Sequence, residues 1–551
     1  MDRVLLLAVL AFPLSVASGG ELVTTNGGMV VSVSPPATDV GVTILKAGGN
    51  AVDAAVAVGF AEAVTWPEAG NIGGGGFMLV WPGDGKEPVV IDYRETAPAK
   101  ATAEMFAKGV SYQSILTAGV PGTVRGLELA HKTFGKRTWK ELVTPAVKLA
   151  ADGFAVTGPL AKRLNDILAD NMTTNAEFRR VFGQGGTWKA GDVLKQPDLA
   201  KTLAAIADGG AAAFYTGKPA ELLVAEMQAE KGLITAEDLK RYKAVARKPV
   251  HGTYRGHDVY GPPPPSSGGI AVVEMLNMLE LHDVKKKPWE SAETAHLMSE
   301  VMRRAFADRA VYLGDADFVK VPAHLTSKDH AKKLMATFDP DKATRSDSLA
   351  PEIAVKDGSN TTHFSIVDKT GMAVSNTYTL ENAFGCRVVV RGAGYILNNE
   401  MTDFNTKPGI TTKAGGIGTL PNQIAPGKRM LSSMTPTLVA KDGKLLLVTG
   451  SPGGRTIINT VLGVVVNVID YGADVQAAVD APRLHHQWFP ERIAAEDRPG
   501  FADFEKLLKV KGHAVTKHQQ GDAHSIHIDP KTGVRTAGVD RRLDGKGAGT
   551  E

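Results

Sequence analysis

A glycine pair, Gly453-Gly454, lies where a predicted strand gives way to a predicted helix. A hairpin over residues 437–440 and 445–449 ends just before it, and an apolar helix is predicted over 456–469. Backbone N–H groups left unshielded at the positive end of a helix can stabilise an anion or a developing oxyanion. The alternatives are a tight turn and a phosphate loop. The chain lacks the G-x-x-x-x-G-K-[ST] spacing, so nucleotide binding is not predicted.

Two acidic residues, Glu400 and Asp403, stand three apart in the segment 399–403. A pair of carboxylates with this spacing could recognise the ammonium group of a substrate. The alternative is a solvated turn with no function.

Two threonines can be placed opposite one another in a second hairpin. Residues 362–367 and 372–379 read as strands, and the turn 368–371 fits a three-residue loop with Gly371 in the left-handed conformation. If Asp368 pairs with Met372, the register sets Thr361 opposite Thr379 on the same face of the sheet. From the pattern alone, this is either a β-branched pair that stabilises a sheet or a pair of facing hydroxyl groups available for chemistry.

Other residues with reactive side chains do not form a recognisable site. Ser432-Ser433 lacks the G-x-S-x-G context of a serine hydrolase, and His485-His486 has no further ligand at metal-binding spacing, so no metal site is predicted. The single cysteine, Cys386, excludes an intrachain disulfide and a multi-thiolate centre, and it is expected to pack as a small apolar side chain.

The composition is that of an ordinary exported globular protein. Of 551 residues, 62 are Lys or Arg and 59 are Asp or Glu, and this balance gives no basis for binding nucleic acid or a membrane surface. Arg3, the apolar run 4–12 and the small residues that follow predict a signal peptide within residues 1–21, cleaved near Ala17. The run is too short to span a bilayer, so we expect a periplasmic or secreted protein.

The predicted elements indicate a layered α/β (α+β) architecture. Helices are expected over 51–63, 124–132, 199–206 and 292–312, with loops at 73–76 and 262–269. From Thr361 onward the pattern changes to short strands, interrupted by the helix 456–469 and ending with strands near 525–528 and 534–539.

Several motifs, taken together and in order, resemble those of the γ-glutamyltranspeptidase (glutathione hydrolase) family, from about residue 22 to 545. They lie in the segments 48–55, 73–77, 92–95, 119–123, 360–365, 377–380, 397–404, 431–436 and 450–454.

The resemblance implies an N-terminal-nucleophile hydrolase with a four-layer αββα sandwich. Such a protein is made as one precursor that cleaves itself, here between Asn360 and Thr361. The large subunit (22–360) and the small subunit (361–551) would then form a heterodimer and build one composite domain. Cleavage would free the α-amine of Thr361, whose reference pKa of ~8 suits a base for its own hydroxyl group. No cofactor or metal is implied.

The resemblance also implies roles for individual residues. Thr361 would be the nucleophile, Thr379 would orient it, and Gly453 and Gly454 would form the oxyanion hole. The remaining residues would bind the substrate: its α-carboxylate would be held by Arg94, Ser432 and Ser433, and its α-ammonium by Glu381, Glu400 and Asp403.

Two positions depart from part of the family. Some members have Asn where this chain has Glu381, a difference that could change the pH response. Others carry an aromatic gate where this chain has Ala414-Gly415-Gly416, which bears on acceptor access.

The expected activity is transfer of the γ-glutamyl group of glutathione and related amides to water or to amino acid and peptide acceptors. One alternative is an acylase of the same fold acting on glutaryl-type amides, but its substrate lacks the α-ammonium that Glu381, Glu400 and Asp403 would bind. The other is a non-catalytic exported binding protein, in which Thr361 would be inert.

Overall fold

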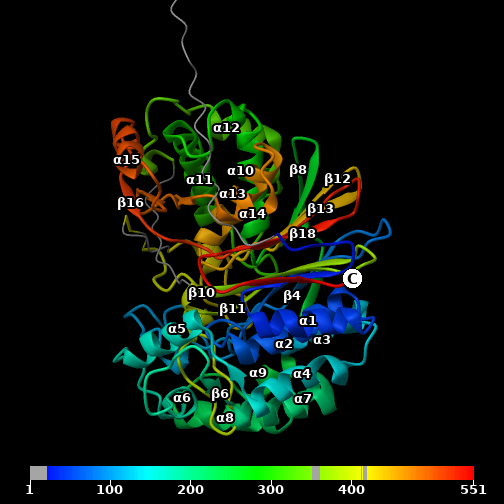
Figure 1. Cartoon of the computed structure of the whole chain (residues 1–551). Coiled ribbons are helices and arrows are strands. Elements are labelled where there is room, and N and C mark those ends of the chain that lie inside the picture. The colour runs from blue at the N-terminus through cyan, green and yellow to red at the C-terminus, as the bar shows by residue number, and fades with distance from the viewer. Residues whose placement is uncertain (1–21, 350–359, 411, 414–417) are drawn as a thin grey trace, which may run out of the picture.

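Two seven-stranded sheets lie face to face between two layers of helices (Figure 1). The computed structural model describes residues 22–349, 360–410, 412–413 and 418–551. The predicted signal peptide and Ala414-Gly415-Gly416 lie outside these residues. The four layers confirm the αββα architecture.

All neighbouring strands within the two large sheets are antiparallel. In the first sheet the order is β1 (Thr24–Thr25), β18 (Arg535–Val539), β17 (His524–Ile528), β13 (Lys444–Thr449), β12 (Thr437–Lys441), β9 (His257–Gly261) and β8 (Val250–Tyr254). In the second it is β19 (Lys546–Gly549), β2 (Met29–Ser32), β10 (Asn360–Val367), β11 (Ala373–Glu381), β3 (Gly75–Trp81), β4 (Val89–Asp92) and β7 (Val245–Arg247). A two-stranded sheet consists of β5 (Phe154–Ala155) and β6 (Val193–Leu194). A three-stranded sheet has the order β14 (Leu484–His485), β15 (Ile493–Ala495) and β16 (Val515–Lys517).

The helices divide between the two outer layers (Figure 1). Beside the second sheet lie α1 (Pro35–Lys46), α2 (Ala51–Thr65), α3 (Thr123–Phe134), α4 (Trp139–Asp152), α5 (Gly158–Ala169), α6 (Ala176–Phe182), α7 (Pro197–Thr216), α8 (Lys218–Ala229) and α9 (Ala236–Arg241). Beside the first lie α10 (Gly268–Leu279), α11 (Ala292–Tyr312), α12 (Lys328–Met335), α13 (Thr456–Ile469), α14 (Val475–Asp480) and α15 (Phe501–Val510). No helix in the described part of the chain is both long and apolar enough to cross a membrane.

The central strands of the second sheet are buried on both faces because alternate side chains enter different cores. Val30 and Met78 pack into the core that contains α2, whereas Val31 and Leu79 pack into the core shared with the first sheet. Helix α2 is itself buried along its whole length. It begins at a capping box in which Asn50 and Asp53 satisfy one another's backbone N–H groups.

Most predicted elements are confirmed, two of them, 292–312 and 456–469, with the same bounds. The loop prediction was wrong at Gly75-Gly76, which begin β3, and at Gly268-Gly269, which begin α10. In β3 the glycines are required by close packing: a Cβ on Gly76 would lie 2.4 Å from the carbonyl oxygen of Thr377 in β11. The prediction also missed α14, α15 and the strands of the first half, β1 to β9.

Both hairpins have the predicted turns. Gly371 has φ +89°, and the pairs from Thr362–Tyr378 to Val367–Ala373 follow the predicted register. The second hairpin turns at Asp442-Gly443, both with positive φ. The register shifts at the open end of the first hairpin, where Asn360 pairs with Glu381, so Thr361 faces a one-residue bulge in β11 and not Thr379 alone.

Candidate active site

Thr361 lies near the start of β10, in the middle of the second sheet, and its side chain is buried. Its hydroxyl group donates a hydrogen bond of 3.4 Å to the hydroxyl oxygen of Thr379. That oxygen also accepts the backbone N–H of Glu381 at 2.8 Å, and the Thr379 carbonyl accepts the side-chain N–H of Asn71 at 2.8 Å. The structure therefore brings the two predicted hydroxyl groups together despite the bulge, and it holds Thr379 from both sides.

One cavity collects most of the residues singled out in the sequence. Its lining contains Arg94, Thr361, Thr379, Glu381, Glu400, Asp403, Ser432, Ser433 and Gly454, together with Arg309, Met434, Arg455 and Ile457. Gly453 lines an adjoining cavity that Thr361 also borders, so Thr361 stands on the wall between the two. The side chain of Asn360 lies outside the described residues.

Arg94 follows β4 and is completely buried. Its guanidinium group is paired with the carboxylates of Glu400 and, at 2.5 Å, Asp403, and its Nε donates to the carbonyl oxygen of Met430 at 3.2 Å. Although burial lowers the pKa of Arg94, the carboxylates around it, Glu95 among them, raise that pKa above its ordinary value. Arg94 therefore stays cationic and bridges the acids.

Glu400 and Asp403 lie on one 3₁₀ turn, residues Glu400–Asp403, with Glu400 fully buried. The solvated-turn alternative is therefore wrong for Glu400. Burial raises the pKa of Glu400 to about 8, against the effect of the adjoining Arg94. Glu381 ends β11 with φ +78°, a left-handed conformation that non-glycine residues rarely adopt and that is common where a side chain is held for function.

Sequence reasoning missed Arg309, on α11, which organises the serine pair. Its guanidinium group donates to the hydroxyl oxygens of Ser433 at 3.0 Å and Ser267 at 2.9 Å, and the Ser267 hydroxyl donates to the carbonyl oxygen of Ser432 at 2.6 Å. The local pattern carries no signal for this role, because a buried arginine in a helix is indistinguishable in sequence from an exposed one. Only the packing of α11 against residues 431–434 identifies it.

Gly453 and Gly454 lie between β13 and α13, as predicted. Their φ angles are +127° and +58°, and a Cβ on Gly453 would lie 2.5 Å from Oγ1 of Thr456. Both conformations favour glycine, and each residue lines a cavity that Thr361 also lines without placing a side chain there. The geometry suits an anion or oxyanion at the wall between the two cavities.

Cys386, the single cysteine, packs as predicted. It is buried, its thiol donates to the carbonyl oxygen of Leu397 at 3.5 Å, and burial raises its pKa to about 12. The thiol is therefore not a nucleophile.

A buried carboxylate next to the Thr361–Thr362 segment gives a test of the electrostatics of the site. Glu62 on α2 accepts a hydrogen bond of 3.2 Å from the Thr362 hydroxyl, and burial raises its pKa to about 8. A carboxyl whose pKa is higher in the folded state stabilises the fold fully below its unfolded pKa, and this contribution is lost as pH rises toward 8. The contribution of Glu62 to the unfolding free energy should therefore fall between pH 5 and 8, by up to about 1.4 kcal/mol per pH unit.

Glu62→Gln should remove the pH-dependent loss of stability that Glu62 causes, because glutamine does not ionise. The thermal midpoint of wild type should therefore fall relative to that of the variant as pH rises, so that the two values converge or cross. The measurement is thermal unfolding at pH 5, 6.5 and 8, with Glu237→Gln on the exposed face of α9 as the control. Other buried acids are common to all three proteins and cancel in the comparison. Parallel pH profiles for Glu62→Gln and wild type would contradict the prediction.

The chain is similar to proteins of one family along almost its whole length. The model of the gamma-glutamyltranspeptidase family matches residues 37–550. The glutathione hydrolase proenzyme of Escherichia coli (strain K12) is 48% identical over 539 residues, covering 96% of this chain and 92% of that protein.

Two solved structures show the same relationship in three dimensions. The cephalosporin acylase from Bacillus halodurans superposes with a TM-score of 0.85 at 28% identity, covering 99% of this chain and 100% of that chain. The gamma-glutamyltranspeptidase from Pseudomonas nitroreducens complexed with L-DON is 45% identical, with a TM-score of 0.55, and covers 57% of this chain and 96% of that chain. On the extent and identity of these matches, the chain belongs to the γ-glutamyltranspeptidase family of enzymes.

Proposed function

We propose that this chain is a precursor that cleaves itself between Asn360 and Thr361 and then acts as a γ-glutamyltransferase and glutathione hydrolase through Thr361. The observation that carries the proposal is the placement of the Thr361 hydroxyl 3.4 Å from that of Thr379, at a cavity that contains both a buried guanidinium group and three carboxylates. A hydroxyl nucleophile beside groups for both charged ends of an amino acid suits a substrate with a free glutamyl unit.

Cleavage would proceed by attack of the Thr361 hydroxyl on the carbonyl carbon of Asn360. The C–N bond breaks, which frees the α-amine of Thr361 and leaves the Asn360 carbonyl esterified to the Thr361 oxygen. Water then hydrolyses the ester to give the Asn360 carboxylate and the free Thr361 hydroxyl group. Two findings on relatives support two subunits. The E. coli relative is named a proenzyme. The Pseudomonas nitroreducens chain is matched over 96% of its length yet covers only 57% of this one, about the share of residues 22–360.

The freed amine would take the proton of the Thr361 hydroxyl, whose oxygen attacks the γ-carbonyl of the donor. Backbone N–H groups of Gly453 and Gly454 would stabilise the oxyanion, and Thr379 would hold the nucleophile by its hydrogen bond. The amine portion of the donor then leaves with a proton from the Thr361 ammonium, and the γ-glutamyl group remains as an ester on the Thr361 oxygen. Water, an amino acid or a peptide then attacks the ester and regenerates Thr361.

The donor would enter by exchanging ion pairs. Without substrate, Arg94 is paired with Glu400 and Asp403. The substrate α-carboxylate would then pair with Arg94 and accept hydrogen bonds from Ser432 and Ser433. Its α-ammonium would pair with the released carboxylates of Glu400 and Asp403, and with Glu381. Each charge of the zwitterion thus meets a group of opposite charge that the fold already holds in the site. The ion pairs formed offset the free-energy cost of removing the substrate's charges from water.

The subunits would remain together as a heterodimer, because β10 of the small subunit pairs with β2 of the large one inside the second sheet. The apolar run 4–12 supports export to the periplasm or secretion. No cofactor enters the proposed chemistry.

The glutaryl acylase of the same fold is the second candidate, favoured by the TM-score of 0.85 to the Bacillus halodurans acylase. The test is turnover of a chromogenic γ-glutamyl anilide beside its glutaryl analogue, which lacks only the α-ammonium. Because charge-assisted hydrogen bonds contribute about 1.5–3 kcal/mol, kcat/KM should be roughly ten- to hundredfold higher for the γ-glutamyl anilide.

Asp403→Asn is the variant for this comparison. It should narrow the ratio of the two kcat/KM values, because weaker ammonium binding affects only the γ-glutamyl anilide, whereas any change at Arg94 affects both substrates. Equal or faster turnover of the glutaryl anilide would assign the acylase activity. If the chain stayed uncleaved and turned over neither anilide, it would be a binding protein.

A further inference from the structure

Two clusters of histidine and carboxylate side chains lie outside the active-site cavity in the described part of the chain. One consists of His296, Glu300 and His513, and the other of Glu274, Asp308 and His330. In each, the nitrogen and oxygen atoms that could ligate a cation lie within 4.8 Å of one another.

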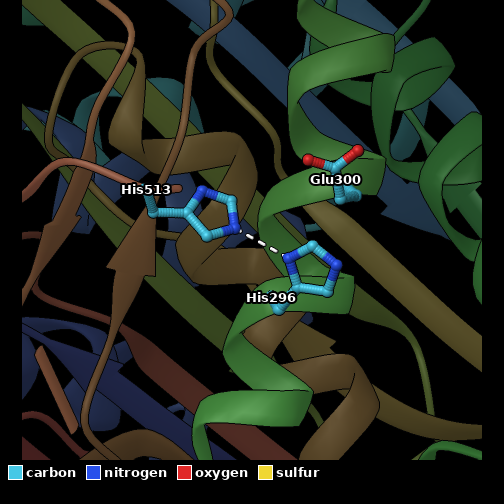
Figure 2. Close-up of side chains that lie close together, drawn as sticks. All are labelled: His296, Glu300 and His513. Atoms are coloured by element: carbon cyan, nitrogen blue, oxygen red, sulfur yellow. Dashed lines mark hydrogen bonds between the residues drawn. The ribbon is translucent and has the colours of Figure 1, made fainter. Parts of the chain in front are cut away.

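The ring nitrogens of the first cluster already have hydrogen-bond partners, and Figure 2 shows the bond between His296 and His513. Nε2 of His296 faces the carbonyl oxygen of Asp339 at 2.8 Å and must donate to it, so Nδ1 of His296 accepts from Nε2 of His513 at 2.7 Å. Arg303 donates toward the other ring nitrogen of His513 at 3.4 Å.

The oxygens of Glu300 are occupied separately: one accepts the Thr344 N–H at 3.0 Å and the other accepts the Arg304 guanidinium at 2.6 Å. A metal on His513 would need a proton moved to the nitrogen that faces Arg303, placing two donors against each other. This cluster therefore fastens α11 to the segment before β16 and offers no ligand for an ion.

The second cluster is incomplete. Glu274, on α10, is only 1% exposed, yet its Oε1 accepts no hydrogen bond from any described residue. This oxygen lies 3.6 Å from Nε2 of His330, which is itself 2.6 Å from Oδ2 of Asp308. Burial and the neighbouring carboxylate of Asp308 raise the pKa of Glu274 well above its ordinary value, so the two carboxyl groups share a proton unless a cation takes its place. Within the described residues, no Lys or Arg is recorded in an ion pair with Glu274 or Asp308 that would offset this effect.

We propose that Glu274, Asp308 and His330 bind a divalent transition-metal ion, with Zn²⁺ as the best fit. One imidazole nitrogen and two carboxylate oxygens suit Zn²⁺, Co²⁺ or Ni²⁺ better than Ca²⁺ or Mg²⁺, which prefer oxygen ligands alone. The two carboxylates balance the charge of the ion, and the unpartnered Oε1 becomes a ligand.

His324 can supply a fourth ligand. Its ring centroid lies 4.8 Å from that of His330, and its side chain is exposed, so a change of rotamer costs little. Asp308 and His330 are each about 15% exposed, which leaves the ion an entry path from solvent. The site thus reaches from a buried ligand on α10 to the surface at α12.

The ion would join three helices that also support the active site. Asp308 precedes Arg309, the residue that holds Ser433, and α10 begins just after Ser267, which holds Ser432. A metal between α10, α11 and α12 would therefore stabilise the helix pair behind the serines. Its role is structural, and no step of the proposed chemistry passes through it.

The experiment is titration of chelator-treated full-length protein with Zn²⁺, followed by calorimetry and thermal unfolding, with Co²⁺ absorption as a second signal. We expect one ion per chain, a rise in the thermal midpoint, and a Co²⁺ spectrum of nitrogen and oxygen ligation. Asp308→Asn and His330→Gln, both at partly exposed positions, should each weaken Zn²⁺ binding by at least about a hundredfold, more than the loss of an outer-shell partner.

His251→Gln is the matched control, because His251 and Asp258 form a largely exposed pair at 2.8 Å that has no third ligand among the residues the structure describes. It should bind Zn²⁺ as wild type does. The proposal is overturned if wild type binds no Zn²⁺, if Asp308→Asn and His330→Gln bind it unchanged, or if binding is lost instead in His513→Gln or Asp403→Asn. The last outcome would place the ion among the acids of the active site.

Discussion

Thr361→Ala is expected to remain a single polypeptide and to lose turnover of a γ-glutamyl anilide by on the order of 10⁴- to 10⁶-fold, the loss seen when a nucleophile is removed. Without the hydroxyl group, no oxygen is available to attack the Asn360 carbonyl, so neither cleavage nor acylation can begin. Wild-type protein should run as two chains on a denaturing gel, and the smaller should begin Thr361-Thr362-His363.

Two further variants separate the bond-breaking hydroxyl from the orienting one. Thr361→Ser keeps a hydroxyl and an α-amine and should retain partial activity. Thr379→Ala removes the acceptor that lies 3.4 Å from the Thr361 hydroxyl but leaves the nucleophile in place. It should therefore cleave slowly and lower kcat more than it raises KM. An intact single chain with full activity would refute the mechanism, and wild-type behaviour of Thr379→Ala would refute the orienting role alone.

Arg94→Lys is expected to lower kcat/KM roughly ten- to hundredfold, mainly through KM. Lysine keeps the positive charge among Glu95, Glu400 and Asp403 but cannot present two parallel N–H groups to a carboxylate. The lost charge-assisted bonds are worth about 1.5–3 kcal/mol. The α-carboxylate is remote from the reacting γ-carbonyl, so binding should suffer more than the chemical step.

The choice of lysine matters because Arg94→Ala would leave the buried acids Glu95 and Glu400 without a cation, at a cost of about 3–5 kcal/mol in folding. The variants are compared by steady-state kinetics after confirming cleavage into two chains. Arg241→Lys, at an exposed ion pair with Glu237, is the control. Unchanged kinetics in cleaved Arg94→Lys would mean that the substrate carboxylate is held by other groups, such as the serine pair.

Local sequence was enough to predict elements whose signals lie within a few residues. The helices at 292–312 and 456–469 have the predicted bounds, and the hairpin turns at Gly371 and Gly443 follow from the left-handed conformation that glycine adopts without strain. The motifs also identified the family, because each is a short contiguous segment and they occur in the same order as in the family. Local sequence did not show that Gly75 and Gly76 belong to strand β3, because these glycines are required by close packing against neighbouring chain segments and not by a turn.

The sequence by itself determined the class of fold, the family and the candidate residues, since each depends on composition, periodicity or contiguous motifs. The tertiary structure alone decided which charges meet. Arg94 and Glu400 are 306 positions apart, and Arg309 and Ser433 are 124 apart. Pairs of this kind form only where the layers pack, and their energies depend on burial, which no local pattern encodes. The bulge opposite Thr361 and the unpartnered oxygen of Glu274 are likewise products of packing, because each arises where distant strands or helices come together.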